Sequence, residues 1–180
     1  GWVRFGVFER VEGSYGAFWT YRRLIGRANF EDPAYGEDVA MINWPGNDYR
    51  GISLIGDSPE RMLEGLREAK ELAMGFCYWL QVDAPRDGGG KGHPEMELDR
   101  SIMGTADGLS KYPYIRESRR IKALYTIGEQ DVAADFHKDQ PRAKHFADSV
   151  GIGWYGIDIH PNDAEKKLPP AATKPFQIPL

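Results

Sequence analysis

One long stretch with the pattern of an amphipathic helix constrains the fold of this chain most. The sequence Asp57-Ser58-Pro59-Glu60 offers a capping residue, a proline for the first turn and a glutamate three residues beyond Asp57. Apolar residues then recur at intervals of three and four, which predicts a helix over about 59–80 with one broad apolar face. These residues are Met62, Leu63, Leu66, Ala69, Leu72, Ala73, Phe76, Cys77 and Leu80. Other elements are expected to cover that face.

Shorter segments on both sides of this helix show strand and helix patterns. Alternation of apolar and polar residues predicts strands over 3–11, 38–43, 122–126 and 149–160. Apolar spacing and capping signals predict short helices over 16–30, 95–106 and 126–135. The sequence therefore predicts an α+β fold, with a mixed or antiparallel sheet packed by the long helix. A chain of 180 residues is expected to form a single domain.

Composition excludes several classes of protein. With 41% hydrophobic and 28% charged residues, the chain resembles an ordinary globular protein, and no apolar run approaches the roughly 20 residues of a membrane span. A net charge of −4 with scattered basic residues argues against a nucleic-acid partner. Cys77 is the single cysteine, so no intrachain disulfide forms. The compartment stays open, with a slight preference for the cytoplasm.

Several features that could suggest a ligand site are interpreted as structural. The glycine-rich stretch 87–94 lacks the spacing of a phosphate-binding loop and is predicted to be a mobile surface loop. The four histidines never occur at the three- or four-residue spacing of a helical ligand pair, so no zinc site is predicted. Asp131, Asp135 and Asp139 are interpreted as part of a solvated face, and Cys77 as a small buried hydrophobe.

Three arginines between apolar anchors form the most prominent charged motif. Arg116, Arg119 and Arg120 lie within Tyr114-Ile115-Arg116-Glu117-Ser118-Arg119-Arg120-Ile121. Guanidinium groups bind carboxylates and polarised oxygens through paired, charge-assisted hydrogen bonds, which makes the run a candidate clamp. An equally weighted alternative is that Glu117 pairs with one arginine in a purely structural ion network.

The predicted strand 149–160 ends in a second candidate. Asp158 and His160 lie two residues apart in an extended segment, so their side chains share a face and the carboxylate is close enough to orient the imidazole. That is the arrangement of an acid/base pair. The alternative is a polar strand end with a surface histidine.

Several of these segments, taken in order, resemble a family of flavoproteins. The segments are Asn43-Trp44-Pro45-Gly46-Asn47-Asp48-Tyr49, the arginine run, Asp148-Ser149-Val150, Asp158-Ile159-His160-Pro161 and Ile178-Pro179-Leu180. They look like the middle section of FAD-dependent oxidoreductases of the glutathione-reductase-like class, in which some members carry the name xanthan lyase. The resemblance covers nearly the whole chain.

The resemblance implies a substrate or cap domain inserted between the halves of an FAD-binding Rossmann domain. The chain contains no Gly-x-Gly-x-x-Gly after a strand, so FAD is expected to be held mainly by the remaining FAD-binding domain, outside these residues. On this analogy the three arginines bind an oxygen-rich small molecule or saccharide. His160, oriented by Asp158, is the general base, and Asn47, Asp48 and Tyr49 add polar contacts. The chain is accordingly expected to be a fragment of a larger flavoenzyme. In isolation it is expected to be inactive and to cover an apolar face by self-association.

A rival interpretation is a non-catalytic carbohydrate-binding or interaction module. The faces of Trp44, Trp154 and Tyr155 have the shape to stack on sugar rings. Aromatic residues are more often part of a core, so these rings favour the module only if they are exposed to solvent.

Overall fold

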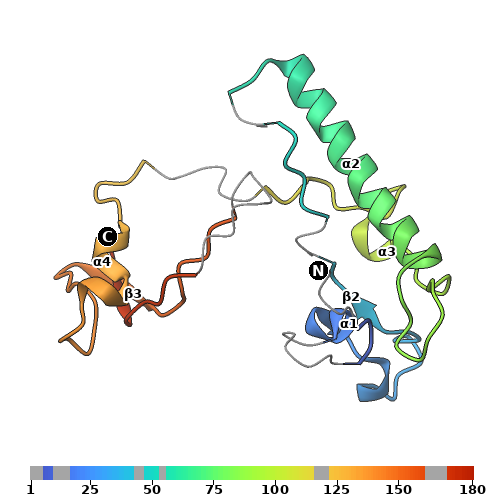
Figure 1. Ribbon diagram of the computed structural model, residues 1–180, viewed down its shortest axis with the longest axis horizontal. Helices are drawn as coiled ribbons and strands as arrows, with labels where there is room; N and C mark the ends of the chain where they lie inside the picture. Colours follow the sequence, from blue (N-terminus) through green and yellow to red (C-terminus); the bar gives the residue numbers. More distant parts are fainter. Residues whose placement is uncertain (1–5, 10–16, 43–46, 53–55, 116–121, 161–169) are drawn as a thin grey trace. The chain divides into compact units, whose positions relative to one another are not determined.

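The chain forms two compact units, Gly1–Tyr114 and Ile115–Leu180 (Figure 1). The computed structural model describes residues 6–9, 17–42, 47–52, 56–115, 122–160 and 170–180. Helices and small antiparallel sheets alternate along the chain, which confirms the α+β prediction. The single substrate domain expected over 1–180 stays a prediction.

The long helix of the first unit is confirmed as α2, Pro59–Val82. Its N-cap is Ser58, whose hydroxyl accepts from the Arg61 N–H at 3.3 Å. Asp57, one residue earlier, instead holds the Arg61 side chain, with its Oδ2 3.0 Å from Nε. Serine takes the cap because proline follows it directly and fits the first helical position.

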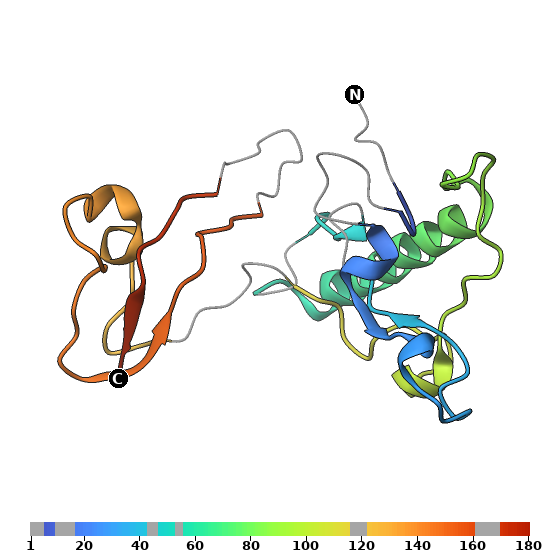
Figure 2. The ribbon, with the colours of Figure 1, turned by 90° about the horizontal axis from the view of Figure 1, so that it is seen from below.

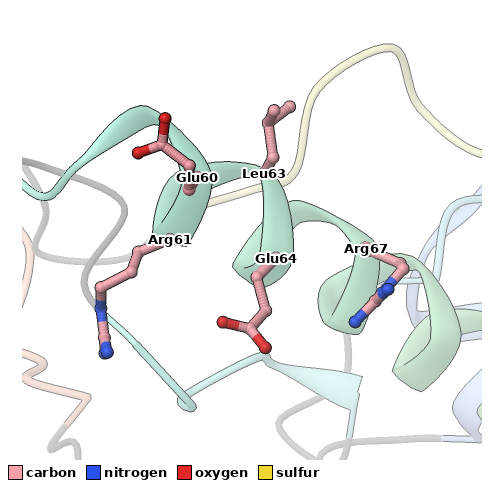
Figure 3. Close-up of a pocket in the computed structure, with 5 residues that line it drawn as sticks. All are labelled: Glu60, Arg61, Leu63, Glu64 and Arg67. Atoms are coloured by element: carbon pink, nitrogen blue, oxygen red, sulfur yellow. The ribbon is translucent and has the colours of Figure 1, made fainter.

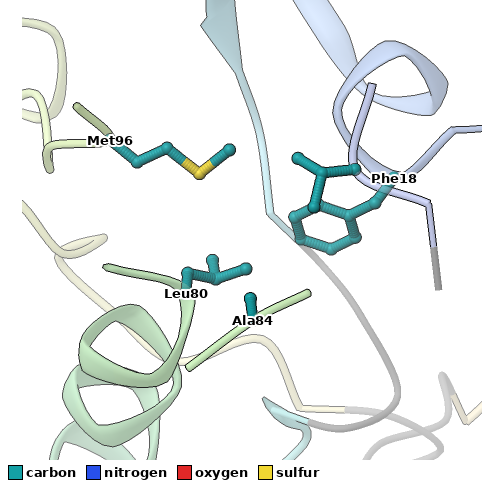
Figure 4. Close-up of a cluster of buried hydrophobic side chains, with 5 residues drawn as sticks. Phe18, Leu80, Ala84 and Met96 are labelled. Carbon is teal, nitrogen blue, oxygen red and sulfur yellow. The ribbon is translucent and has the colours of Figure 1, made fainter. Parts of the chain in front are cut away.

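The core of the first unit gathers at the C-terminal end of α2. Val7, Phe18, Leu80, Ala84 and Met96 are buried together (Figure 4). Four partly buried side chains pack around them: Trp19, Ile42, Phe76 and Trp79. Burial of this cluster packs the segments around Val7, Phe18 and Met96 against the last turns of α2.

The expectation that the whole apolar stripe of α2 lies on the core is wrong. Leu63 is 68% exposed and Leu72 37% exposed, whereas Leu80 is only 1% exposed. The buried side chains that pack on the helix come from the segments around Val7, Phe18 and Met96, and they meet only its last turns. Within the described residues, the N-terminal half of α2 therefore presents much of its apolar surface to solvent.

Short elements replace the helix predicted over 16–30. They are α1 (Phe18–Tyr21), β1 (Arg23–Ile25) and η1 (Arg27–Asn29). β1 pairs antiparallel with β2 (Val39–Ala40), which is the central part of the predicted strand 38–43. The Asp38 carboxylate accepts from the Arg27 N–H at 2.7 Å and contacts the Arg23 guanidinium at 3.3 Å. This contact between distant residues outweighs the local helical spacing.

The glycine-rich stretch after α2 begins with an aspartate that holds the N-terminal segment, while residues 87–91 lie on the surface as predicted and their mobility stays a prediction. Asp87 accepts three backbone hydrogen bonds, from Val7 at 2.9 Å, Phe8 at 2.7 Å and Glu9 at 2.9 Å. Residues 6–9 consequently form a bend, and the strand predicted over 3–11 is wrong in that described part. Burial of the carboxylate opposes the shift, yet these hydrogen bonds hold the pKa of Asp87 below its ordinary value.

A single turn of helix stands where a longer one was predicted over 95–106. This helix, α3, spans Arg100–Met103. Asp99 caps it by accepting from the backbone of Ser101 and Ile102, both at 2.9 Å, and Gly104 ends it at φ +64°. The cap and the left-handed glycine stand only five residues apart, which explains why the helix is so short.

The described residues of the second unit form two short helices and a two-stranded sheet. Its elements are α4 (Glu129–Val132), η3 (Ala134–Phe136), β3 (Ser149–Gly153) and β4 (Phe176–Pro179). β3 and β4 pair antiparallel and run side by side in Figure 2. The strand predicted over 122–126 is wrong, because residues 122–126 contain no strand, and β4 was not predicted.

The helix predicted over 126–135 is present as α4 and η3, and a buried carboxylate organises it. Asp131, 3% exposed, accepts from the Gly128 N–H at 2.9 Å and from the Tyr125 hydroxyl at 2.8 Å. The Lys144 ammonium lies 3.3 Å from the same carboxylate. Asp131, interpreted from the sequence as part of a solvated face, is thus the centre of the second unit. Gly128 is the N-cap of α4.

Candidate functional site

Asp158 and His160 lie next to each other, as the sequence predicts. The Asp158 Oδ2 lies 3.5 Å from the His160 Nε2, and the two side chains are 48% and 24% exposed. The carboxylate beside Nε2 favours the neutral tautomer with its proton on that nitrogen. A catalytic role for the pair stays a prediction.

The backbone that carries this pair is only partly in the predicted strand. β3 ends at Gly153, and beyond it Ile157 forms an isolated bridge with Ala171. The Ile157 N–H donates to the Ala171 carbonyl at 2.8 Å, and the Ala171 N–H returns the bond at 3.0 Å. The strand prediction over 149–160 therefore holds to Gly153 and fails beyond it as regular structure, although this bridge still anchors the segment.

Two aromatic rings precede the pair and are open to solvent. Trp154 is 75% exposed and Tyr155 is 77% exposed. The Tyr155 carbonyl accepts from the Thr173 hydroxyl at 2.9 Å, which holds the backbone just after the second ring. Large exposed aromatic rings on an anchored backbone are typical of a surface that a ligand covers.

The polar residues Asn47, Asp48 and Tyr49 belong to the first unit. The Tyr49 hydroxyl donates to the Glu68 carboxylate on α2, and burial together with this contact raises the pKa of Tyr49 to about 12. Asp48 lies 4.0 Å from the Arg50 guanidinium. Tyr49 thus fastens its loop to α2, and its hydroxyl is occupied by a carboxylate, not presented to solvent. A substrate-binding role for these three residues stays a prediction.

A shallow hollow on the first turns of α2 carries none of the predicted site residues. It is lined by Glu60, Arg61, Leu63, Glu64 and Arg67. In Figure 3 these side chains leave a single helix and diverge, with Glu60 and Leu63 on one side and Arg61 and Glu64 on the other. An open surface of this kind lacks the convergent polar groups of a ligand site.

The described part of the chain offers neither a metal cluster nor a membrane helix. Across the described ranges, no three side chains of histidine, cysteine, aspartate or glutamate gather closely enough to hold a metal ion. No helix among those same residues combines the length and apolarity needed to cross a bilayer.

Comparison with known families decides the class of the chain. Residues 7–180 match the family described as FAD dependent oxidoreductase. The chain belongs to this family. No curated protein matches it, and no solved structure matches it. As a member of an FAD-dependent oxidoreductase family, the chain is assigned to flavin-dependent redox chemistry at the level of the family.

The glycine-rich stretch 87–92 of this family member does not fit the FAD pyrophosphate. A phosphate is bound by N–H groups at a helix N-terminus. The glycines of 87–92 instead follow the C-terminal end of α2, where carbonyl oxygens carry partial negative charge. Gly92 has φ +78°, and a Cβ there would lie 2.6 Å from the Gln81 carbonyl oxygen. The Lys91 ammonium is paired with Asp83 at 2.6 Å.

The arginine run falls largely outside the described residues. Arg116, Arg119 and Arg120 all lie outside the described residues, so their role as a substrate clamp stays a prediction. The sequence pattern did not reveal that Asp87 holds residues 7–9 or that Asp131 organises the second unit. Asp87 accepts from a backbone far away in the sequence, which leaves no local periodicity. Asp131 accepts from Gly128, three residues before it, so only its place in the first turn of a short helix hints at its role.

Proposed function

We propose that this chain is the substrate-binding part of an FAD-dependent oxidoreductase and positions an oxygen-rich substrate against the flavin for hydride transfer. The family match over residues 7–180 carries the proposal. FAD is held mainly by an FAD-binding domain outside these residues, since the glycines after α2 lie at the wrong end of a helix for a phosphate. The glutathione-reductase-like arrangement of that domain is part of the same proposal.

His160 acts as the general base of this proposal. Its Nδ1 accepts the proton of a substrate hydroxyl, while Asp158, 3.5 Å from Nε2, fixes the tautomer and stabilises the imidazolium that forms. The substrate alcohol then carries the negative charge that favours loss of hydride from its carbon. Arg116, Arg119 and Arg120 bind further oxygens of the substrate.

The test is the rate of flavin reduction in the full-length, FAD-loaded protein. Aldoses, polyols and 2-hydroxy acids are added anaerobically, and the loss of the visible flavin band is followed in a stopped-flow instrument. His160→Gln is expected to slow reduction by a factor of about 10²–10⁴. Asp158→Asn is expected to slow it less.

A matched control is His145→Gln, because His145 is an exposed histidine of the same unit. Its reduction rate is expected to equal that of the unmodified protein. Equal rates for the His160 variant and this control would refute the assignment of the base, even if the flavin itself is reduced.

A further inference from the structure

The segment 154–160 carries an exposed indole and an acid/base pair on one face, and we propose that this face binds a neutral saccharide. The inference rests on the proposed function for the reaction, because it names the class of the oxygen-rich substrate. Binding itself needs no flavin and is tested separately.

The backbone of this segment remains extended beyond the end of β3. Gly153 is paired with Phe176, and Ile157 is paired with Ala171. The first segment advances by four residues between these two pairs, and the opposite segment by five. The two segments therefore keep running antiparallel, with one extra residue on the side of Ala171, as in a bulge. The hydrogen bond from Thr173 to the Tyr155 carbonyl falls between these two points and holds the intervening stretch.

Alternation in an extended backbone sorts the side chains of the segment onto two faces. Trp154, Gly156, Asp158 and His160 share one face, and Tyr155 falls on the other. The contact of Asp158 with His160 at 3.5 Å agrees with this sorting. Gly156 contributes no side chain between the indole and the pair, and a Cβ there would lie 3.4 Å from the Ala171 carbonyl oxygen. At about 3.3 Å per residue, Trp154 and Asp158 are roughly 13 Å apart along the backbone, which suits one or two sugar rings.

The chemistry of this face matches a sugar better than another flat ligand. One side of a pyranose ring is lined with C–H groups that stack on an indole, while its hydroxyls donate to a carboxylate and to the nitrogen of an imidazole. At 75% exposure the Trp154 ring is available for such stacking.

Charge argues for a neutral ligand. The segment 154–160 contains one carboxylate and neither lysine nor arginine. A nucleotide or a sugar phosphate would bring its negative charge next to Asp158 without a cation from this segment to offset the repulsion. The geometry therefore points to an uncharged, hydroxyl-rich ligand.

The experiment is calorimetric titration of the chain with maltose, cellobiose and lactose, with glucose 6-phosphate and FAD as charged comparisons. At least one disaccharide is expected to bind, and Trp154→Ala is expected to weaken it about tenfold or more. Tyr155→Ala is the matched control, since Tyr155 is equally exposed and lies on the other face, and it is expected to bind within about twofold of the unmodified chain. Trp154→Phe, which retains a ring, is expected to keep most of the affinity and guards against a folding defect in the alanine variant.

Three outcomes would overturn the inference: no disaccharide binds at about 10 mM, or the two alanine variants weaken binding equally, or FAD displaces the sugar in a manner that depends on Trp154. The last result would assign the face to the flavin. Failure of sugar binding leaves the proposed oxidoreductase function standing if the full-length protein holds flavin and depends on His160.

Discussion

Replacement of Asp131 tests whether a polar network, not an apolar core, stabilises the second unit. Only Val132, Ala133 and Ala143 are buried apolar residues among the described part of this unit. Asp131→Ala removes the acceptor of the Gly128 N–H, a charge-assisted bond of 2.9 Å. Such a bond contributes about 1.5–3 kcal/mol, so we expect the free energy of unfolding to fall by about 2–3 kcal/mol.

The other two partners of Asp131 add little to this figure. Tyr125 is 37% exposed and the Lys144 side chain is 44% exposed, so water replaces the lost carboxylate at both. Asp131→Asn retains one oxygen that accepts from Gly128 but loses the charge, and we expect it to cost about 1–2 kcal/mol.

The pH dependence of the effect has a defined sign. The hydrogen bond from Gly128, with those from Tyr125 and Lys144, lowers the pKa of Asp131 in the folded state. The stabilisation is therefore present above the unfolded pKa of about 4 and is lost as the pH falls through the lower folded pKa. In the Asn variant that part of the acid dependence is expected to disappear.

The assay is urea unfolding followed by NMR signals of the second unit, together with amide exchange of Gly128. Asp135→Ala is the control, because the Asp135 side chain is 92% exposed and lies 3.8 Å from Lys138. It is expected to change stability by less than about 0.5 kcal/mol. Equal effects of the Asp131 and Asp135 variants would refute the reasoning.

Two further predictions concern the first unit. Asp87→Asn is expected to speed amide exchange of residues 7–9 by about tenfold or more, because an amide N–H₂ group replaces one of the two oxygens that accept three backbone hydrogen bonds. The control Asp83→Asn is expected to leave the exchange of these residues unchanged. Burial and the contact with Glu68 raise the pKa of Tyr49 to about 12, so we expect its hydroxyl to ionise at a higher pH than the ordinary value of about 10. A difference spectrum between the unmodified protein and Tyr49→Phe that shows ionisation near pH 10 would contradict this.

How much of this structure the sequence predicts depends on whether the signal is local. α2 was predicted to within two residues because a proline, a cap and a continuous apolar stripe all lie within one stretch of chain. Segment 16–30 has helical spacing too, but the bonds of Asp38 to residues 23 and 27 convert it into a strand and turns. Helical periodicity carries no information about such distant partners.

The candidate site shows the same division. Asp158 and His160 are two residues apart, so a local rule predicts their contact. β4, by contrast, has no alternation strong enough to be detected alone, and it exists because it pairs with β3 more than twenty residues away. Trp154 follows the last residue of β3, and the sequence left open whether its ring lies in a core or on the surface.

The visible absorption spectrum of the full-length protein tests the central claim most directly. If this chain serves an FAD-dependent oxidoreductase, the protein purified with FAD shows the bands of oxidised, bound flavin. The His160→Gln variant is expected to retain those bands, and its flavin is expected to be reduced slowly by the substrate. A colourless full-length protein that takes up no FAD on reconstitution would contradict the account.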